Sequence, residues 1–295
     1  MSVAVFLREL LTARLDPAAL EWLDGALAEV AGGVDPDRFA VLVALASRHV
    51  PRAPLAATPE ERGGAAELLA GWDPERWDCL DAARALLVLA LPDLESVGGE
   101  LFVEEAFRHA DVGEQVALLR SLPLVPRPER FLWRMGEGAR TNMRAVFEAA
   151  CCDNPFPAAA FDETAWRSAA LKALFVGAPL WRVWGLDGRL DAELARMALD
   201  FADERRSAGR SVPPELWLCL GPHGGERGLA SIELELDSGP REGRAAAALA
   251  LARAGRLERL GELAQAESDP WVRAIMDRAL EGESGQAAFA ALEQA

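Results

Sequence analysis

The sequence contains few of the residue types that carry common site chemistry. Among 295 residues it has three histidines and four cysteines, without a Cys-x-x-Cys spacing, so it predicts neither a zinc knuckle nor a thioredoxin-like site. The scattered histidines do not stand with serine or cysteine in a triad pattern. The glycine-rich segment 221–225 lacks the following lysine and serine of a phosphate-binding loop. We therefore expect no metal ion, no cofactor and no catalytic residue that a motif identifies.

Lysine is nearly absent, since Lys172 is the one lysine in a chain whose other fixed positive charges are all arginine. A genomic bias toward arginine and alanine codons would explain this, because either cation serves on a solvated helix face. Alternatively, an amine is needed at this position. A lysine in a pocket could bind phosphate or carboxylate or form a Schiff base, whereas a surface lysine extends its charge to water.

Positive charge and long apolar runs are also scarce. The net charge of −16 and the pI near 4.7 argue against nonspecific binding to nucleic acid or anionic membranes, because phosphates would be repelled. No segment approaches the roughly 20 apolar residues of a membrane-spanning helix. Arg8 and Glu9 interrupt the apolar stretch near the start, so we do not expect it to be a signal peptide. We expect the cysteines to be buried, reduced thiols and the protein to be cytoplasmic.

Helical spacing of apolar residues recurs along most of the chain. Asp16-Pro17 opens one such segment, followed by Leu20 and Leu23 at a helical interval, and proline at a first helical position costs no hydrogen bond. The segment 232–237 (IELELD) alternates apolar and charged residues as a strand would, but no second strand is available to pair with it. We expect this segment to be helical and the protein to be all-α.

The C-terminal third repeats a helix–turn–helix pattern. Pro240 and Pro270 mark corresponding turns, and SDPWVRAIMDRAL resembles the turn and second helix of a HEAT repeat. Stacked helix pairs of this kind form an α-solenoid, so we expect one elongated or crescent-shaped domain. Its expected parts are N-terminal helices at 1–50, a loop at 51–66, a helical core at 67–225, HEAT-like helix pairs at 226–282 and a C-terminal tail at 283–295.

Carboxylates follow one face of the helix that is expected to start at Asp191. Asp200, Asp203 and Glu204 occupy neighbouring positions of that helix and could converge on a divalent cation. They could instead form i, i+4 ion pairs with Arg196 on a solvated face. The lack of a matching carboxylate pair on another helix favours ion pairs, because a metal site in a helical bundle draws its ligands from several helices.

Further polar residues recur within the apolar periodicity of residues 140–222. Asn154 precedes a proline and could satisfy the backbone of a turn, and Asp187 lies in a Gly-Leu-Asp-Gly helix connection. Trp181 and Trp184 could line an aromatic groove. We predict a candidate ligand pocket from this stretch that consists of Asn142, Glu148, Asn154, Lys172, Arg182, Asp187, Asp200, Glu204 and Arg205.

From Trp72 onward the sequence resembles the EboA family, named for a eustigmatophyte-associated bacterial operon. The resemblance is carried, over about half of the chain, by GWDPERWDCLDAARALLVL, LLRSLPLVPRPERF, EGARTNMRAVFEA, NPFPAAAF, LKALFVGAPLWRVWGLDGR, LARMALDFADERRSAGR and PELWLCLGP. These segments are specific as an ordered set. Similar members often carry histidine at the position of Asp203.

The resemblance implies a cytoplasmic protein encoded beside biosynthetic enzymes. Those neighbours typically look like a sugar-phosphate cyclase, a UbiA-type prenyltransferase, a TatD-type metal hydrolase and an isomerase-like barrel. The pathway would make or export a specialised metabolite. For EboA itself the resemblance implies no reaction.

We therefore expect a noncatalytic accessory protein that holds a metabolite intermediate, or a partner enzyme of the same operon, on an α-solenoid surface. The alternative is an enzyme that acts on a phosphorylated or prenylated intermediate through Lys172 and the carboxylates of Asp200, Asp203 and Glu204. A self-associating structural protein is a third possibility. Neither nucleic acid nor membrane insertion is expected, and the oligomeric state stays open.

Overall fold

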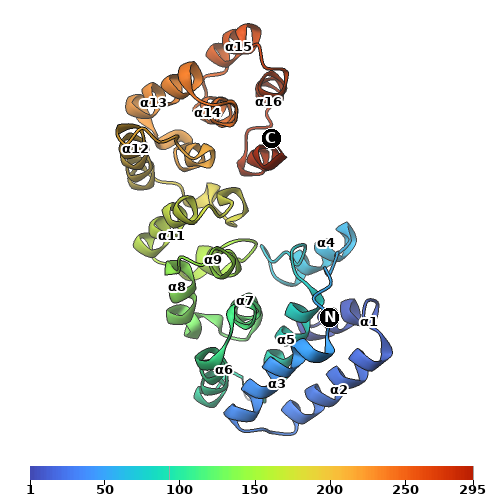
Figure 1. Ribbon diagram of the computed structural model, residues 1–295. Helices are drawn as coiled ribbons and strands as arrows, with labels where there is room; N and C mark the ends of the chain where they lie inside the picture. Colours follow the sequence, from blue (N-terminus) through green and yellow to red (C-terminus); the bar gives the residue numbers. More distant parts are fainter. Residues whose placement is uncertain (93, 295) are drawn as a thin grey trace. The chain divides into compact units, whose positions relative to one another are not determined.

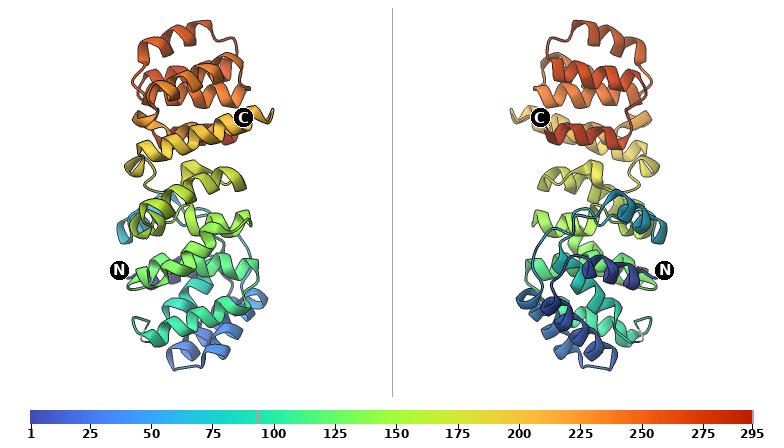
Figure 2. Two further views of the ribbon diagram at one scale, coloured as in Figure 1. Left: turned by 90° about the vertical axis from the view of Figure 1, so that its left-hand side faces the viewer. Right: turned by 90° about the vertical axis from the view of Figure 1, so that its right-hand side faces the viewer.

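The computed structural model describes residues 1–92 and 94–294, and every regular element in this part of the chain is a helix (Figure 1). The same coiled ribbons are seen from two further sides in Figure 2. The chain divides into two compact units, Met1–Ala165 and Trp166–Ala295, which we call unit 1 and unit 2. None of the described helices combines the length and apolarity needed to cross a bilayer. The prediction of an all-α protein is confirmed.

Unit 1 contains ten α-helices within its described residues. They are α1 (Val3–Thr12), α2 (Pro17–Ala31), α3 (Pro36–His49), α4 (Pro59–Leu68), α5 (Cys79–Leu89), α6 (Val97–His109), α7 (Val112–Ser121), α8 (Leu132–Arg140), α9 (Arg144–Cys151) and α10 (Phe156–Ala160). The 3-10 turns η1 (Leu122–Leu124) and η2 (Pro128–Phe131) connect α7 to α8.

Unit 2 begins in the first turn of α11 (Glu163–Val176). Its other elements are η3 (Leu180–Arg182), η4 (Asp187–Arg189), α12 (Ala192–Ser207), η5 (Pro214–Cys219), η6 (Gly221–His223), α13 (Gly225–Ser238), α14 (Arg241–Arg253), α15 (Leu257–Ala266), α16 (Pro270–Leu280) and η7 (Gln286–Gln294). The segment 232–237 lies inside α13, so its assignment as helix is confirmed.

Many of these helices begin at a capping side chain that the sequence makes visible. Asp16 and Asp35 each precede a proline, and their carboxylates accept hydrogen bonds from amide groups three residues on, at 2.8 and 2.7 Å. Asp191 caps α12 in the same way at 2.7 Å. Because the first amide groups of a helix lack internal partners, these local contacts determine where the helices start.

Unit 1 is organised around α5, of which residues 79–88 are all buried. Helices α1, α2, α3 and α7 pack on it. Its sequence CLDAARALLVL is apolar around most of the helix, which is the pattern of an enclosed helix. Asp81 and Arg84 are the exceptions, with exposed fractions of only 5% and 1%.

In unit 2, α14 has the corresponding role. Residues 245–252 are all buried, and α13, α15, α16, η5 and η7 pack against the helix. Pro240 and Pro270 stand at the starts of α14 and α16. The two helix–turn–helix pairs expected in the C-terminal third are therefore present as α13–α14 and α15–α16.

The segment 51–66, expected to be a loop, is helical in its second half because α4 begins at Pro59. Thr58 and Glu61 form a reciprocal capping box at its start, with hydrogen bonds of 2.8 and 3.2 Å. This start signal outweighs the two glycines that follow. One of them, Gly64, lies against the ring of Phe6, so that an added Cβ would stand 3.3 Å from Cε2. The connecting loop is therefore shorter than the sequence predicts.

The segment 283–295 was expected to be a tail, but its described residues pack within unit 2 through η7. The Nε2 of Gln286 donates to the carbonyl oxygens of Trp181 and Val183, both at 2.7 Å. Phe289 is fully buried. The aromatic anchor and the two hydrogen bonds hold this segment in the unit.

Candidate functional site

Three of the predicted pocket residues lie in unit 1, around α9. Asn154 is buried; its Nδ2 donates to the carbonyl of Ala149, and its Oδ1 accepts from the amide two residues later, both at 2.9 Å. Glu148 pairs with Arg144 at 2.6 Å, and Asn142 is exposed ahead of the helix. Asn154 therefore closes the turn between α9 and α10, as its position before a proline suggested.

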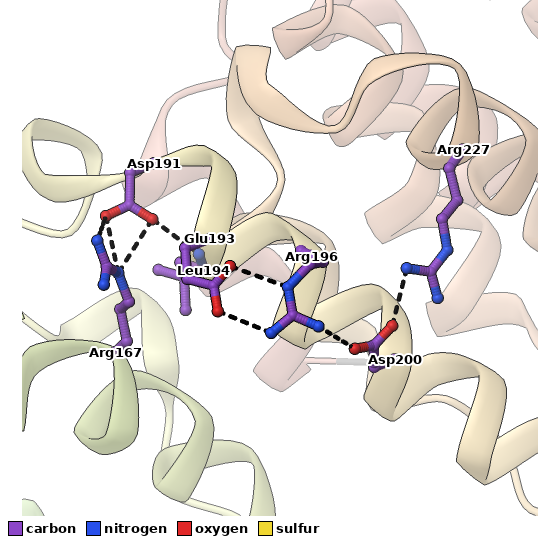
Figure 3. Close-up of polar contacts among 7 residues, drawn as sticks. All are labelled: Arg167, Asp191, Glu193, Leu194, Arg196, Asp200 and Arg227. Atoms are coloured by element: carbon purple, nitrogen blue, oxygen red, sulfur yellow. Dashed lines mark hydrogen bonds and ion pairs between the residues drawn. The ribbon is translucent and has the colours of Figure 1, made fainter. Parts of the chain in front are cut away.

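Asp200 belongs to a ladder of ion pairs along α12 (Figure 3). At the start of the helix, Asp191 accepts hydrogen bonds of 2.7 to 3.2 Å from Arg167 of α11, which hold the pKa of this carboxyl below its ordinary value. Arg196 then bridges Glu193 at 2.7 Å and Asp200 at 2.5 Å. The ladder thus ties α11 to α12 and continues along the exposed side of α12.

An arginine from the next helix ends the ladder. Arg227 of α13 pairs with Asp200 at 2.8 Å and with Asp203 at 2.6 Å, and Figure 3 shows the first of these contacts. Among the described residues, no group of three His, Cys, Asp or Glu side chains is arranged to hold a metal ion. The two aspartates form ion pairs between helices, which agrees with the second of the two interpretations of this face.

Asp187 connects the middle of unit 2 to its C-terminal segment. Its carboxylate accepts hydrogen bonds of 2.5 and 3.2 Å from Arg253 and one of 3.1 Å from the amide of Gln286. Partial burial would raise the pKa of Asp187, but the hydrogen bonds and charge of Arg253 bring it below its ordinary value. Through these contacts Asp187 helps to hold η7 on the rest of unit 2.

The remaining predicted residues are divided between two settings. Lys172 is half-buried on α11, and Arg182 is 7% exposed in η3; neither lines the two hollows described below. Glu204 and Arg205, by contrast, line one of them. The predicted pocket residues therefore do not share one setting, and this pair on α12 is the part of the set that borders a hollow.

The four cysteines are buried thiols, as expected. Burial raises the pKa of Cys79 and raises that of Cys219 to about 12. Burial also raises the pKa of Cys151. Because the thiolate is the reactive form, these shifts favour a packing role over nucleophilic chemistry.

The unit 2 hollow, as we call it, has a volume of about 440 Å³. It is lined by Leu174, Phe175, Val176, Gly177, Phe201, Glu204, Arg205, Arg210 and Pro213. Phe175 and Phe201 form its aromatic wall, with ring centroids 4.4 Å apart. The Nε of Arg205 donates to the carbonyl of Ser211 at 2.9 Å, which fixes one side of the polar rim.

Two helices end at the unit 2 hollow. Gly177, at φ +69°, terminates α11, and Gly209, at φ +65°, terminates α12; both values are in the left-handed region that glycine adopts without strain. The carbonyl groups at helix ends carry partial negative charge, which Arg205 and Arg210 counter. The hollow therefore combines an apolar wall with a rim of mixed charge.

A second hollow, the unit 1 hollow, has a volume of about 450 Å³. It is lined by Arg52, Pro54, Glu75, Arg76, Trp77, Asp78, Asp81, Val112, Gly113, Val116, Arg120 and Ala145. The predicted pocket contains none of these residues. Its walls come from the start of α5, one face of α7, the first turn of α9 and the loop after α3.

Two buried charge pairs stand at or behind the unit 1 hollow. Asp81 pairs with Arg120; burial raises the pKa of Asp81, and Arg120 opposes this in part. Arg84 donates to the carbonyl of Val43 at 3.0 Å and pairs with Glu114 at 3.3 Å, and burial lowers the pKa of Arg84. The signal for this region was present in the sequence, because charged residues inside an enclosed apolar helix need partners.

A family model described as metabolite traffic protein EboA matches residues 3–221 of the chain. The matched stretch includes every residue that lines either hollow and begins well before the segments that suggested the resemblance, so that α1 to α4 also belong to the family region. Comparison with curated proteins and with solved structures gave no match.

Proposed function

Because this chain belongs to the EboA family, we propose that it is a noncatalytic accessory protein that binds a metabolite in the unit 2 hollow. The observation that carries the proposal is the position of Phe175. This residue is 63% exposed although its ring contacts the tilted ring of Phe201 at the wall of a hollow. The description of the family as metabolite traffic proteins supports a role that involves a metabolite.

An exposed phenyl ring at a hollow favours an apolar ligand. Full burial of such a side chain stabilises by roughly 1.5–3 kcal/mol relative to exposure, so a ligand that covers Phe175 would gain part of that free energy. The volume of about 440 Å³ lies within the range of roughly 300–1,000 Å³ that is usual for small-molecule sites.

The rim supplies the polar contacts that would orient the ligand. Glu204, Arg205 and Arg210 border the same hollow as the two rings. An amphipathic metabolite would place its apolar body on Phe175 and direct its polar end toward these side chains. Ligand pockets commonly combine apolar walls, which contribute affinity, with a few polar groups, which orient the ligand.

The proposal includes an architecture and a setting. The helix pairs α13–α14 and α15–α16, with proline at corresponding turns, support a HEAT-like end of an α-solenoid. The setting is the cytoplasm, where the protein would receive an intermediate of specialised metabolism from an enzyme encoded in the same operon, or pass it to one. The family resemblance supports this setting.

The test measures which small molecules accompany the protein. The full chain is purified from a host that carries the neighbouring operon genes, and small molecules released on denaturation are identified by mass spectrometry. Binding of the neutral apolar probe N-phenyl-1-naphthylamine is followed by fluorescence. The expected result is one dominant amphipathic compound that competes with the probe.

The matched variants are Phe175→Ala and Leu234→Ala. Leu234 lies on α13 of the same unit and is 49% exposed, but it does not line the hollow. Phe175→Ala should weaken probe binding by about ten-fold or more, the loss expected from removing a large apolar contact, and Leu234→Ala should leave it unchanged. Equal effects of the two variants, or turnover of the compound by the purified protein, would contradict the proposal.

A further inference from the structure

We propose that the unit 1 hollow is a second binding site, and that it takes a small organic anion with an apolar body and a carboxylate or phosphate monoester group. This site lies in a different unit from the one assigned above. It is carried by different residues, so it does not depend on the proposed function. The central residue is Arg52.

Arg52 lies at the rim, where it is exposed to solvent. It makes no hydrogen bond or ion pair with any residue that the structure describes. Its guanidinium lies against the bare Cα of Gly113, where an added Cβ would stand 3.1 Å from Cζ and closer still to Nη2. Gly113 is in the first turn of α7, so the absence of a side chain there lets the guanidinium lie directly on the helix.

The charges around this position are mixed. The amino end of α7 carries partial positive charge, and the capping carboxylates of Asp111 and Glu114 add negative charge beside it. The buried Arg84 lies close enough that the charge of Arg52 helps to lower its pKa, with burial as the main cause. An anion at the rim would therefore bind chiefly through the guanidinium of Arg52, which has no carboxylate partner among the described residues.

The carboxylates at the amino end of α7 are already engaged. Asp111 accepts from the amide of Glu114 at 2.8 Å, and Glu114 accepts from the amide of Asp111 at 3.0 Å. Glu114 also pairs with Arg84 at 3.3 Å. These oxygens satisfy the helix end and the buried arginine.

The carboxylates that line the hollow are engaged as well. Asp78 accepts from the amide of Asp81 at 2.7 Å, and the carboxylate of Asp81 pairs with Arg120. Glu75 pairs with Arg62 at 2.9 Å. Arg52 is therefore the charge at this rim that the described carboxylates leave for a ligand.

A third helix contributes backbone donors. Ala145, in the first turn of α9, lines the hollow. Whereas α5 and α7 have complete capping boxes, the N-cap residue of α9, Met143, provides no side-chain cap, and the hydroxyl of Thr141 accepts from the amide of Met143 at 3.2 Å. The first amide groups of α9 add to the anion-binding character of the rim.

The apolar lining determines the rest of the ligand class. Val112, Val116, Pro54 and the ring of Trp77 face the same space, and Val112 is 45% exposed. A volume of about 450 Å³ exceeds what an inorganic anion requires. The surfaces therefore fit an anion that carries an aromatic or aliphatic body.

The test uses calorimetric titration of the full chain with three ligands of similar shape: phenyl phosphate, benzoate and neutral benzamide. The two anions should bind and benzamide should bind at least about ten-fold more weakly, the effect expected for loss of a charge-assisted hydrogen bond. Tighter binding of phenyl phosphate identifies a phosphate monoester site, and tighter binding of benzoate identifies a carboxylate site. Added salt should weaken both.

The matched variants are Arg52→Ala and Arg48→Ala, which remove the same charge from neighbouring parts of the chain. Arg48, in the last turn of α3, does not line the hollow. Arg52→Ala should weaken binding of the anions about ten-fold, Arg52→Lys should weaken it less, and Arg48→Ala should leave it unchanged. All should keep the circular dichroism of the parent and its binding of N-phenyl-1-naphthylamine.

Two results would overturn the inference. One is equal affinity for benzamide and the two anions, which would remove the electrostatic argument. The other is an equal loss of anion affinity in Arg52→Ala and Arg48→Ala, which would show that the variants act through the net charge of the protein and not through a contact at the hollow. Because the neutral probe reports on the unit 2 hollow, failure here leaves the proposed function unaffected, and the reverse also holds.

Discussion

The two hollows differ in which ends of the helices face them. The unit 1 hollow is bordered by the amino ends of α5, α7 and α9, through residues such as Asp78, Gly113 and Ala145. The unit 2 hollow lies where α11 and α12 end, beside Val176 and Arg205. The backbone therefore favours negative charge in unit 1, which capping carboxylates supply at α5 and α7 but not at α9, and positive charge in unit 2, which Arg205 and Arg210 supply.

This contrast shows that an arginine at a rim is not enough to infer an anion site. Arg205 and Arg210 lie near helix carboxyl ends, where a cation stabilises the helix. Arg52 lies against an amino end, where it does not counter the partial charge of the backbone. An arginine therefore counters the partial charge of the helix ends at the unit 2 hollow but not at the unit 1 hollow.

The central helices differ in a related way. In unit 1, α5 carries the buried charges of Asp81 and Arg84. In unit 2, the buried residues 245–252 of α14 are all alanine or leucine, and the buried carboxylate, Glu235, comes from the neighbouring α13 and pairs with Arg206 at 3.1 Å. The stability of unit 1 should therefore fall most when a buried charge loses its partner. The stability of unit 2 should fall most when a side chain adds volume to the core.

The largest expected effect is that of Arg84→Ala in unit 1. Removal of one partner of a buried pair leaves Glu114 without its counter-charge and opens a cavity, at a cost of about 3–5 kcal/mol. The measurement is urea unfolding followed by circular dichroism. The double variant Arg84→Met, Glu114→Gln should recover much of the loss; a double variant no more stable than Arg84→Ala would contradict this explanation.

Gly243→Ala tests added volume in unit 2. The new Cβ would stand 3.1 Å from Cδ of Pro240 and closer still to Oε1 of Glu235, so overpacking should cost about 1–3 kcal/mol. The control is Gly261→Ala on α15, where an added Cβ has open space among the described residues. Its higher helix propensity should stabilise by about 0.5–1 kcal/mol. The same unfolding experiment should give shifts of opposite sign.

Asp81 in unit 1 and Asp191 in unit 2 should change the free energy of unfolding with pH in opposite directions. Burial raises the pKa of Asp81 above its ordinary value of 3.8. The unfolded chain then loses this proton first, so the stability of the parent relative to Asp81→Asn should fall as the pH rises through the raised pKa.

For Asp191 in unit 2, the hydrogen bonds from Arg167 lower the pKa. Its contribution is present above 3.8 and should disappear as the pH falls through the lowered value. Unfolding midpoints of the parent, Asp81→Asn and Asp191→Asn between pH 2 and 7 measure both slopes. Slopes of the same sign would contradict the difference in burial between the two carboxylates.

The smallest expected effect is that of Arg196→Ala in the ladder on α12. Arg196 and Asp200 are both about half exposed, at 54% and 49%, so water and salt screen their attraction. We expect a shift in the unfolding midpoint smaller than that of any other variant. A shift as large as that of Gly243→Ala would mean that the ladder, rather than apolar packing, holds α12 in unit 2.

The sequence by itself determined the features that depend on residues close in the chain. The helix starts at Asp16, Asp35 and Asp191 could be predicted because a cap contacts an amide three residues on. The ion pair between Arg196 and Asp200 follows from the same short spacing. The family resemblance also came from the sequence, and the match over residues 3–221 confirms it.

The tertiary structure alone decided which polar residues share a setting. Asp187 meets Arg253, Arg84 meets Glu114, and Arg52 lies on Gly113. These partners are 66, 30 and about 61 residues apart, and helical periodicity carries no information over such separations. For this reason the predicted pocket included Glu204 and Arg205 at the unit 2 hollow but none of the residues that line the unit 1 hollow.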